Sequence, residues 1–107
     1  MTKLTIENTK TFLEKEGNYT IRLLNRNVAP PKQYIFALLW LNGNTSLWMV
    51  RFIGQNIRAL FEKSSKDFLE AKQILIEEIE GYLSRGYKIT GYESGITYPP
   101  PWLARKR

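Results

Sequence analysis

Residues 34–53 read YIFALLWLNGNTSLWMVRFI, two apolar runs separated by Asn42-Gly43-Asn44. Apolar runs rich in aromatic and branched residues are typical of β-strands, and Asn-Gly supplies the positive φ angles of a type I′ turn. The stretch therefore predicts a tight hairpin with Asn42 and Gly43 as its two loop residues, which pairs Leu41 with Asn44.

Side chains alternate across a strand, so this register divides the hairpin into two faces. One face carries aromatic and aliphatic residues and ends in an arginine: Tyr34, Phe36, Leu38, Trp40, Leu47, Met49 and Arg51. The other carries Ile35, Ala37, Leu39, Trp48, Val50 and Phe52, with the small Ala37 opposite Trp48. We assign the second face to the core. Moving the turn to Gly43-Asn44 would swap the facing of the second run.

The first face also needs a cover, because a patch of this apolar character is rarely left in water. One alternative is that residues 1–16 or the C-terminal tail pack over it. The other is that Tyr34, Phe36 and Trp40 form a stacking or partner surface.

Shorter patterns predict the remaining sheet partners and a small helix. Alternation predicts a strand over 19–24, a loop follows over 25–33, and further strands are expected over 57–61 and 88–92. A short helix is expected from Thr9, as N-cap, to Gly17, as C-terminal stop.

The main helix is expected over about 65–85. Its apolar positions fall mostly three and four residues apart, which places one stripe against a sheet. These positions are Phe68, Ala71, Leu75, Ile79, Tyr82 and Leu83. A serine at the start of Ser64-Ser65-Lys66-Asp67 is the expected N-cap, and Gly86 the expected stop. The fold class is thus α+β: an antiparallel sheet of about four strands with this helix packed on one face.

Composition limits both organisation and chemistry. The 107 residues make one domain, expected over 1–97, followed by a Pro-rich, basic tail over 98–107. The chain contains no His and no Cys, the usual bases, nucleophiles and metal ligands, so we expect no enzyme activity, metal or cofactor. Residues 1–7 lack the apolar segment of a signal peptide, and the longest apolar run has eight residues, so a cytoplasmic location without membrane insertion is expected.

The distribution of charge carries the functional signal. Between Gly17 and Phe61 the chain has no Asp or Glu but five Lys and Arg residues. Guanidinium groups and rings on a surface without carboxylates attract polyanions, although strands are depleted in acids for packing reasons as well. The candidate binding residues are Arg22, Arg26, Lys32, Arg51 and Arg58 for phosphate, Tyr34 and Trp40 for stacking, and Trp102, Arg105, Lys106 and Arg107 in the tail.

The order of strands before a long helix that ends in Ser84-Arg85-Gly86-Tyr87 loosely resembles WGR domains, which are small nucleic-acid-associated modules. The family's Trp-Gly-Arg run is replaced here by Trp48-Met49-Val50-Arg51. No site residue is therefore carried over from the resemblance.

We expect a non-catalytic nucleic-acid-binding or nucleic-acid-associated protein that uses a basic, aromatic sheet face. The alternative is a protein-binding adaptor or inhibitor that docks on a larger partner through the sheet face and the Pro-Trp tail. A homodimer formed through the same face is a third reading.

Overall fold

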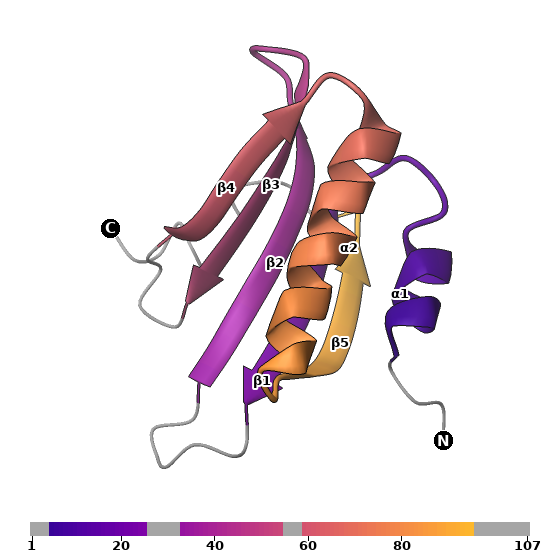
Figure 1. The fold of residues 1–107 in the computed structure, drawn as a ribbon. Coiled ribbons are helices and arrows are strands. Elements are labelled where there is room, and N and C mark those ends of the chain that lie inside the picture. Colours follow the sequence, from indigo (N-terminus) through magenta and orange to yellow (C-terminus); the bar gives the residue numbers. More distant parts are fainter. Residues whose placement is uncertain (1–4, 26–32, 55–58, 96–107) are drawn as a thin grey trace.

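The computed structural model describes residues 5–25, 33–54 and 59–95. Five strands form one antiparallel sheet in the order β4-β3-β2-β1-β5, and two helices lie on one of its faces (Figure 1). The elements are α1 (Ile6–Phe12), β1 (Tyr19–Asn25), β2 (Gln33–Asn42), β3 (Leu47–Gly54), β4 (Ala59–Ser65), α2 (Phe68–Ser84) and β5 (Lys88–Ser94). The predicted α+β class is confirmed, and the segment expected over 88–92 supplies the fifth strand.

The central hairpin forms, but its predicted register is wrong. Leu41 pairs with Trp48, not with Asn44, and four residues, 43–46, connect the strands. Asn42 explains the difference. Its side-chain Oδ1 accepts a hydrogen bond from the Asn44 amide at 2.9 Å, and its backbone carbonyl accepts one from the Ser46 amide at 2.8 Å. An Asn that closes a local turn in this way competes with the two-residue type I′ turn.

The predicted faces are nevertheless confirmed. The register differs by four residues, and an even shift leaves every side chain on its predicted side of the sheet. Ala37 faces Phe52 in place of Trp48. The face assigned to the core is buried: Ile35, Ala37, Leu39, Trp48, Val50 and Phe52 belong to the main hydrophobic cluster together with Ile21 and Leu23 of β1.

Helix α2 covers this core face and connects the two edge strands, β4 and β5 (Figure 1). Its buried residues are Phe68, Ala71, Leu75, Ile76, Ile79 and Tyr82, so the predicted stripe is confirmed, with Ile76 added and Leu83 partly exposed. The serine N-cap is wrong. Strand β4 continues to Ser65, and Asp67 caps the helix by accepting from the Leu69 amide at 3.4 Å.

Helix α2 stops as predicted before Gly86, which follows the C-cap Arg85. The Gly86 amide donates to the Leu83 carbonyl at 3.1 Å, and the Tyr87 amide donates to the Tyr82 carbonyl at 3.1 Å. This is the Schellman pattern, which requires a left-handed residue, and Gly86 has φ 102°. The rings of Tyr82 and Tyr87 pack edge to face at 5.3 Å and complete the motif.

The N-terminal helix begins and ends earlier than predicted. Thr5, not Thr9, is the N-cap and accepts from the Asn8 amide at 3.2 Å, and Leu13, not Gly17, is the C-cap. Thr9 is buried inside the helix, where its hydroxyl lies 2.7 Å from the hydroxyl of Tyr92 in β5. This contact and the burial of Leu13 place α1 on the core face beside α2. The expectation that the N-terminal segment covers the other face is therefore wrong for residues 5–16.

Truncating the buried stripe of α2 should destabilise the protein strongly. Leu75→Ala and Ile79→Ala each leave a cavity in the main cluster, and each should lower the free energy of unfolding by about 2–5 kcal/mol. Leu69, which is 66% exposed on the same helix, is the matched control, and Leu69→Ala should cost less than about 1 kcal/mol. Urea denaturation of the three variants measures these values. Equal midpoints would contradict the packing of α2.

Two glycines of the same helix should respond to alanine with opposite signs. Gly86→Ala places a side chain at φ 102° and should cost about 1–2 kcal/mol. Gly81 lies inside α2, where an added Cβ would meet only the Arg85 side chain at an ordinary 3.6 Å. Gly81→Ala should therefore stabilise the protein by about 1 kcal/mol, because alanine has the higher helix propensity. Thermal denaturation measures the melting temperatures of both variants. A change of the same sign in both melting temperatures would refute this account of the helix end.

Candidate nucleic-acid interface

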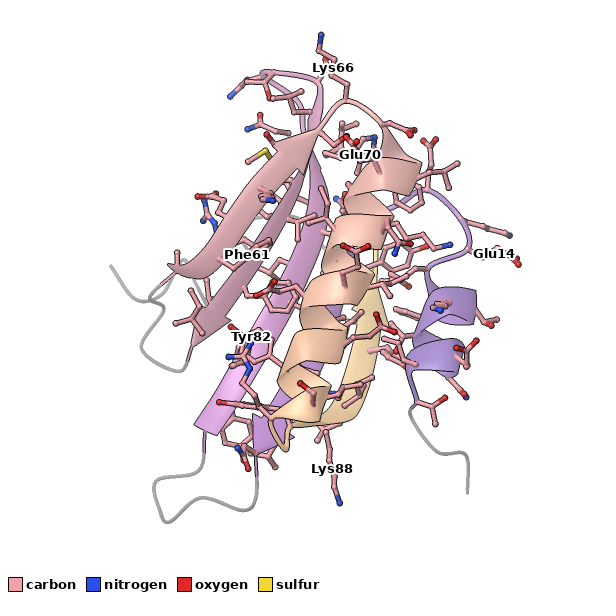
Figure 2. The ribbon with its side chains drawn as sticks, in the orientation of Figure 1. Glu14, Phe61, Lys66, Glu70, Tyr82 and Lys88 are labelled. Carbon is pink, nitrogen blue, oxygen red and sulfur yellow. The ribbon has the colours of Figure 1, made fainter. Side chains whose placement is uncertain are left out.

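The charges of the chain are divided unevenly between two sets of residues. Residues 5–18 and 66–85, which we call the helix layer, contain eight of the ten carboxylates and five of the sixteen Lys and Arg residues. The remaining residues contain two carboxylates and eleven Lys and Arg residues. The helix layer thus has a net charge of −3 and the rest of the chain +9. Figure 2 shows Glu14 and Glu70 in the helix layer and Lys88 at the far end of the sheet.

The sheet face opposite α2, which we call the open face, brings three polar residues together at one corner. Register places Arg22 between Phe36 and Gly91, and Leu24 between Tyr34 and Lys88. Arg22, Tyr34 and Lys88 therefore occupy two adjacent rows on β1, β2 and β5. Arg22 and Lys88 are exposed, and Tyr34 is 41% exposed. We call these three residues the basic corner.

Gly91 allows the Arg22 side chain to lie flat across strand β5. A Cβ atom added at Gly91 would lie 2.3 Å from one terminal nitrogen of Arg22 and 2.8 Å from its Cζ. The guanidinium group therefore occupies the space over β5 that a side chain at position 91 would fill. The ion pairs of the described residues join Arg51 to Glu62 and Lys10 to Glu7, and Arg22 takes part in neither.

Arg51 and Trp40, both predicted to bind ligand, contact each other. The Arg51 guanidinium lies 5.4 Å from the centroid of the Trp40 ring. It also pairs with Glu62 on β4, where Nε donates to Oε2 at 2.9 Å. Trp40 is only 7% exposed. The charge of Arg51 is thus balanced by a carboxylate, and the Trp40 ring is buried against it.

The other predicted residues lie outside the described residues: Arg26, Lys32, Arg58, Trp102, Arg105, Lys106 and Arg107. Lys88 and Gly91 were not predicted from the sequence. An isolated glycine inside a predicted strand is a signal of close approach by another group, so Gly91 could have been found. Lys88 carried no such signal, because its place beside Leu24 depends on the pairing of β5 with β1.

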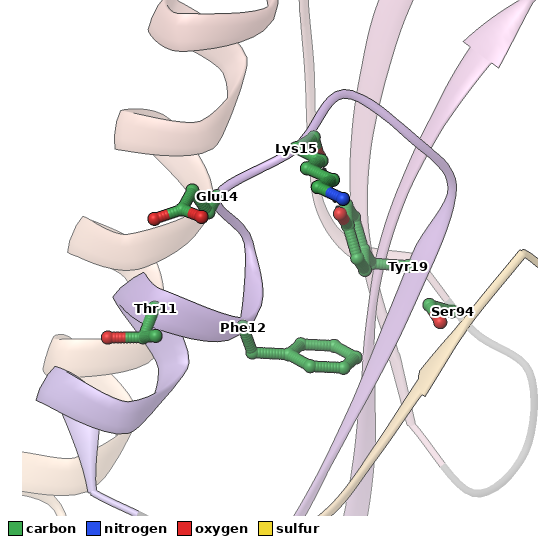
Figure 3. Close-up of a pocket in the computed structure, with 6 residues that line it drawn as sticks. All are labelled: Thr11, Phe12, Glu14, Lys15, Tyr19 and Ser94. Atoms are coloured by element: carbon green, nitrogen blue, oxygen red, sulfur yellow. Dashed lines mark hydrogen bonds between the residues drawn. The ribbon is translucent and has the colours of Figure 1, made fainter.

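A shallow hollow of about 240 Å³ lies between α1 and the strands β1 and β5 (Figure 3). It is lined by Thr11, Phe12, Glu14, Lys15, Tyr19 and Ser94. The Tyr19 hydroxyl donates to the Lys15 carbonyl, and burial raises the pKa of the Tyr19 phenol. Ligand pockets are usually larger, at about 300–1,000 Å³, so this hollow suits a few water molecules better than a substrate.

The raised pKa of Tyr19 predicts a loss of stability in alkali. Burial favours the neutral phenol in the folded state, so the Tyr19 pKa is higher in the folded than in the unfolded chain. Its contribution is complete below the ordinary pKa of about 10 and is lost as the pH rises through the folded pKa. Tyr19→Phe should therefore lose less unfolding free energy than the parent between about pH 9.5 and 11.5. Urea titrations across this range measure it, and parallel losses in both proteins would contradict the assignment.

Two further properties of the described residues bear on function. Neither described helix is long and apolar enough to cross a membrane. Within the described ranges, no group of three or more acidic, His or Cys side chains is placed to hold a metal ion.

Comparison with known proteins adds no family to this description. No family model matches the sequence, no curated protein matches it, and no solved structure matches the fold.

Proposed function

We propose that the protein is a non-catalytic nucleic-acid-binding protein and that the basic corner is part of its binding surface. The observation that carries the proposal is the uneven distribution of charge, −3 in the helix layer and +9 in the rest of the chain, to which the described residues contribute +2. A polyanion is attracted to the cations outside the helix layer and repelled by the net negative charge of the helix layer. The helix layer therefore faces away from the ligand.

The geometry of the basic corner supports this orientation. Tyr34 on β2 and Lys88 on β5 flank β1, so the corner spans two strand spacings, about 10 Å. One segment of single-stranded nucleic acid can contact all three residues. Arg22 and Lys88 supply cations for phosphate, and the Tyr34 ring offers a stacking platform that does not discriminate between bases.

Arg51 and Trp40 have a supporting role in this proposal. Arg51 shares its charge with Glu62, and an ion pair of this kind must break or reorganise before the arginine binds phosphate. Trp40 keeps its ring under the guanidinium group. Among the described residues, we therefore propose that Arg22, Tyr34 and Lys88 contact the ligand directly. Arg22 and Tyr34 were predicted from the sequence, and Lys88 is added by the structure.

Strand β4 favours the second candidate function, an adaptor that binds another protein. β4 is an edge strand, paired with β3 on one side, and its Leu60 is 48% exposed. An extended segment of a partner can add to such an edge through backbone hydrogen bonds.

A pair of charge reversals tests the nucleic-acid proposal. Arg22→Glu combined with Lys88→Glu should weaken binding to a labelled single-stranded oligonucleotide, because two phosphate contacts are lost. The slope of log K against log salt should fall in magnitude by about 0.7 for each contact. Lys15→Glu combined with Lys66→Glu makes the same change of net charge in the helix layer and should have a much smaller effect. Fluorescence anisotropy over about 50–200 mM salt measures all three proteins.

Glu62→Gln tests the proposal with a variant that should bind nucleic acid more tightly than the parent. It removes the carboxylate partner of Arg51 and should tighten binding while changing stability by less than about 1 kcal/mol. Equal affinities for both charge-reversal pairs would contradict the basic corner. No binding by the parent, together with a copurified protein that resists nuclease treatment, would favour the adaptor function.

A further inference from the structure

The open face carries a second apolar cluster that is closed to solvent. Leu38, Trp40 and Ile53 form its buried centre, with Phe36 and Met49 packed against them. Leu38 and Ile53 are each 2% exposed, and the neighbouring Thr20 is 1% exposed. Both described helices lie on the other face, and within residues 5–25, 33–54 and 59–95 no element packs over this cluster.

Thr20 shows that water is excluded from this face. Its hydroxyl oxygen is buried and has no hydrogen-bond partner among the described residues. A hydroxyl on an uncovered sheet face would reach solvent, and a buried one without a partner is disfavoured. The cover over Thr20 and Leu38 is therefore close.

We propose that the C-terminal segment, residues 96–107, is this cover. Its sequence, ITYPPPWLARKR, places two aromatic rings, three prolines and two aliphatic residues before the final basic residues. Three consecutive prolines favour the extended polyproline II conformation, which loses little conformational entropy when it packs on a flat surface. The proposal is independent of nucleic-acid binding.

The point at which the chain leaves the sheet fits this segment. The Gly95 amide still donates to the Asn18 carbonyl at 2.8 Å, and Asn18 Oδ1 accepts from the Leu41 amide at 3.1 Å. The chain therefore leaves β5 at the level of Trp40. Strand β3 lies three strand spacings away, about 14 Å, whereas twelve residues of polyproline II span about 37 Å.

The other segments outside the described residues are badly placed or too short. Residues 1–4 precede α1 on the opposite face and span at most about 14 Å. The strand ends that flank residues 26–32 and 55–58 lie at the end of the sheet remote from Trp40: Asn25 pairs with Gln33, and Gly54 pairs with Ile35. Trp40 lies seven residues along β2 from Gln33, about 23 Å, and a seven-residue connection that returns to the sheet reaches about half as far.

Disulfide trapping tests the contact cleanly, because the chain has no cysteine of its own. Met49→Cys places a thiol on the open face, and Trp102→Cys or Leu103→Cys places a second one in the tail. Two tail positions are needed because neighbouring residues of an extended chain point to different sides. Gln73→Cys, on the exposed side of α2, replaces Met49→Cys in the control. Mild oxidation and non-reducing electrophoresis then read the products.

We expect an intramolecular disulfide in a monomer with Met49→Cys and at least one tail position, and at least tenfold less with Gln73→Cys. Cross-linked dimers without the intramolecular product would overturn the proposal in favour of a second copy of the chain on this face. Equal yields with Gln73→Cys, or no product with either tail position, would also overturn it.

Removal of the segment gives a measurement that does not depend on cysteine. Truncation after Gly95 should lower the melting temperature by at least about 4 °C, since it uncovers Leu38, Trp40 and Ile53. It should also shift the tryptophan emission to longer wavelength. Trp102→Phe, which keeps the apolar cover and removes the tail's own fluorophore, is the control for that spectrum. An unchanged melting temperature and unshifted Trp40 emission after truncation would contradict the proposal.

Discussion

The rest of the structure depends on the exclusion of water from both faces of the central strand β2. Ile35, Ala37 and Leu39 point to one side and Leu38 and Trp40 to the other, and all are buried. Apolar surface on both sides requires two covers, since burial of apolar area is the main favourable term in folding. Helix α2 supplies one cover, and its length and stripe are fitted to this strand and its neighbours. The helix layer also contains eight of the ten carboxylates, whereas the described strands carry Arg22, Arg51, Lys63 and Lys88.

The fold could be predicted because its signals are local and repeat. The alternation in residues 34–53 fixed which side chains face the core, and this result survived a wrong turn because the register error was an even number of residues. The helix stop at Gly86 needs a positive φ angle that glycine adopts readily, so it could be read from one residue. Caps were less predictable. Ser65, Asp67 and Thr5 are all good capping residues, and the choice between neighbouring candidates depends on where β4 and α1 pack, which no local pattern contains.

The candidate site was only partly predictable, for a related reason. Residues 18–60 contain no carboxylate, yet β4 returns Glu62 to the same face and pairs it with Arg51. Lys88 joins Arg22 from the far end of the chain. Whether a cation on a strand is balanced or available is thus decided by its cross-strand neighbours. Net charge over a stretch of sequence cannot supply this information, whereas strand order and register can.

Strand β5 has a consequence for the order in which the chain folds. The pairs β1–β2, β2–β3 and β3–β4 join strands that follow one another, whereas β5 pairs with β1, so that Tyr19 meets Ser94 across seventy-five residues. Bringing β5 to β1 closes a long loop, and the entropy of loop closure is lost before the contacts of β5 can compensate for it. Contacts between residues distant in sequence also slow folding. The four-stranded meander can therefore assemble first, with α2 docked on it, and β5 joins last. Until it does, β1 is an open edge, and the nascent protein is most exposed to strand exchange with other chains at that edge.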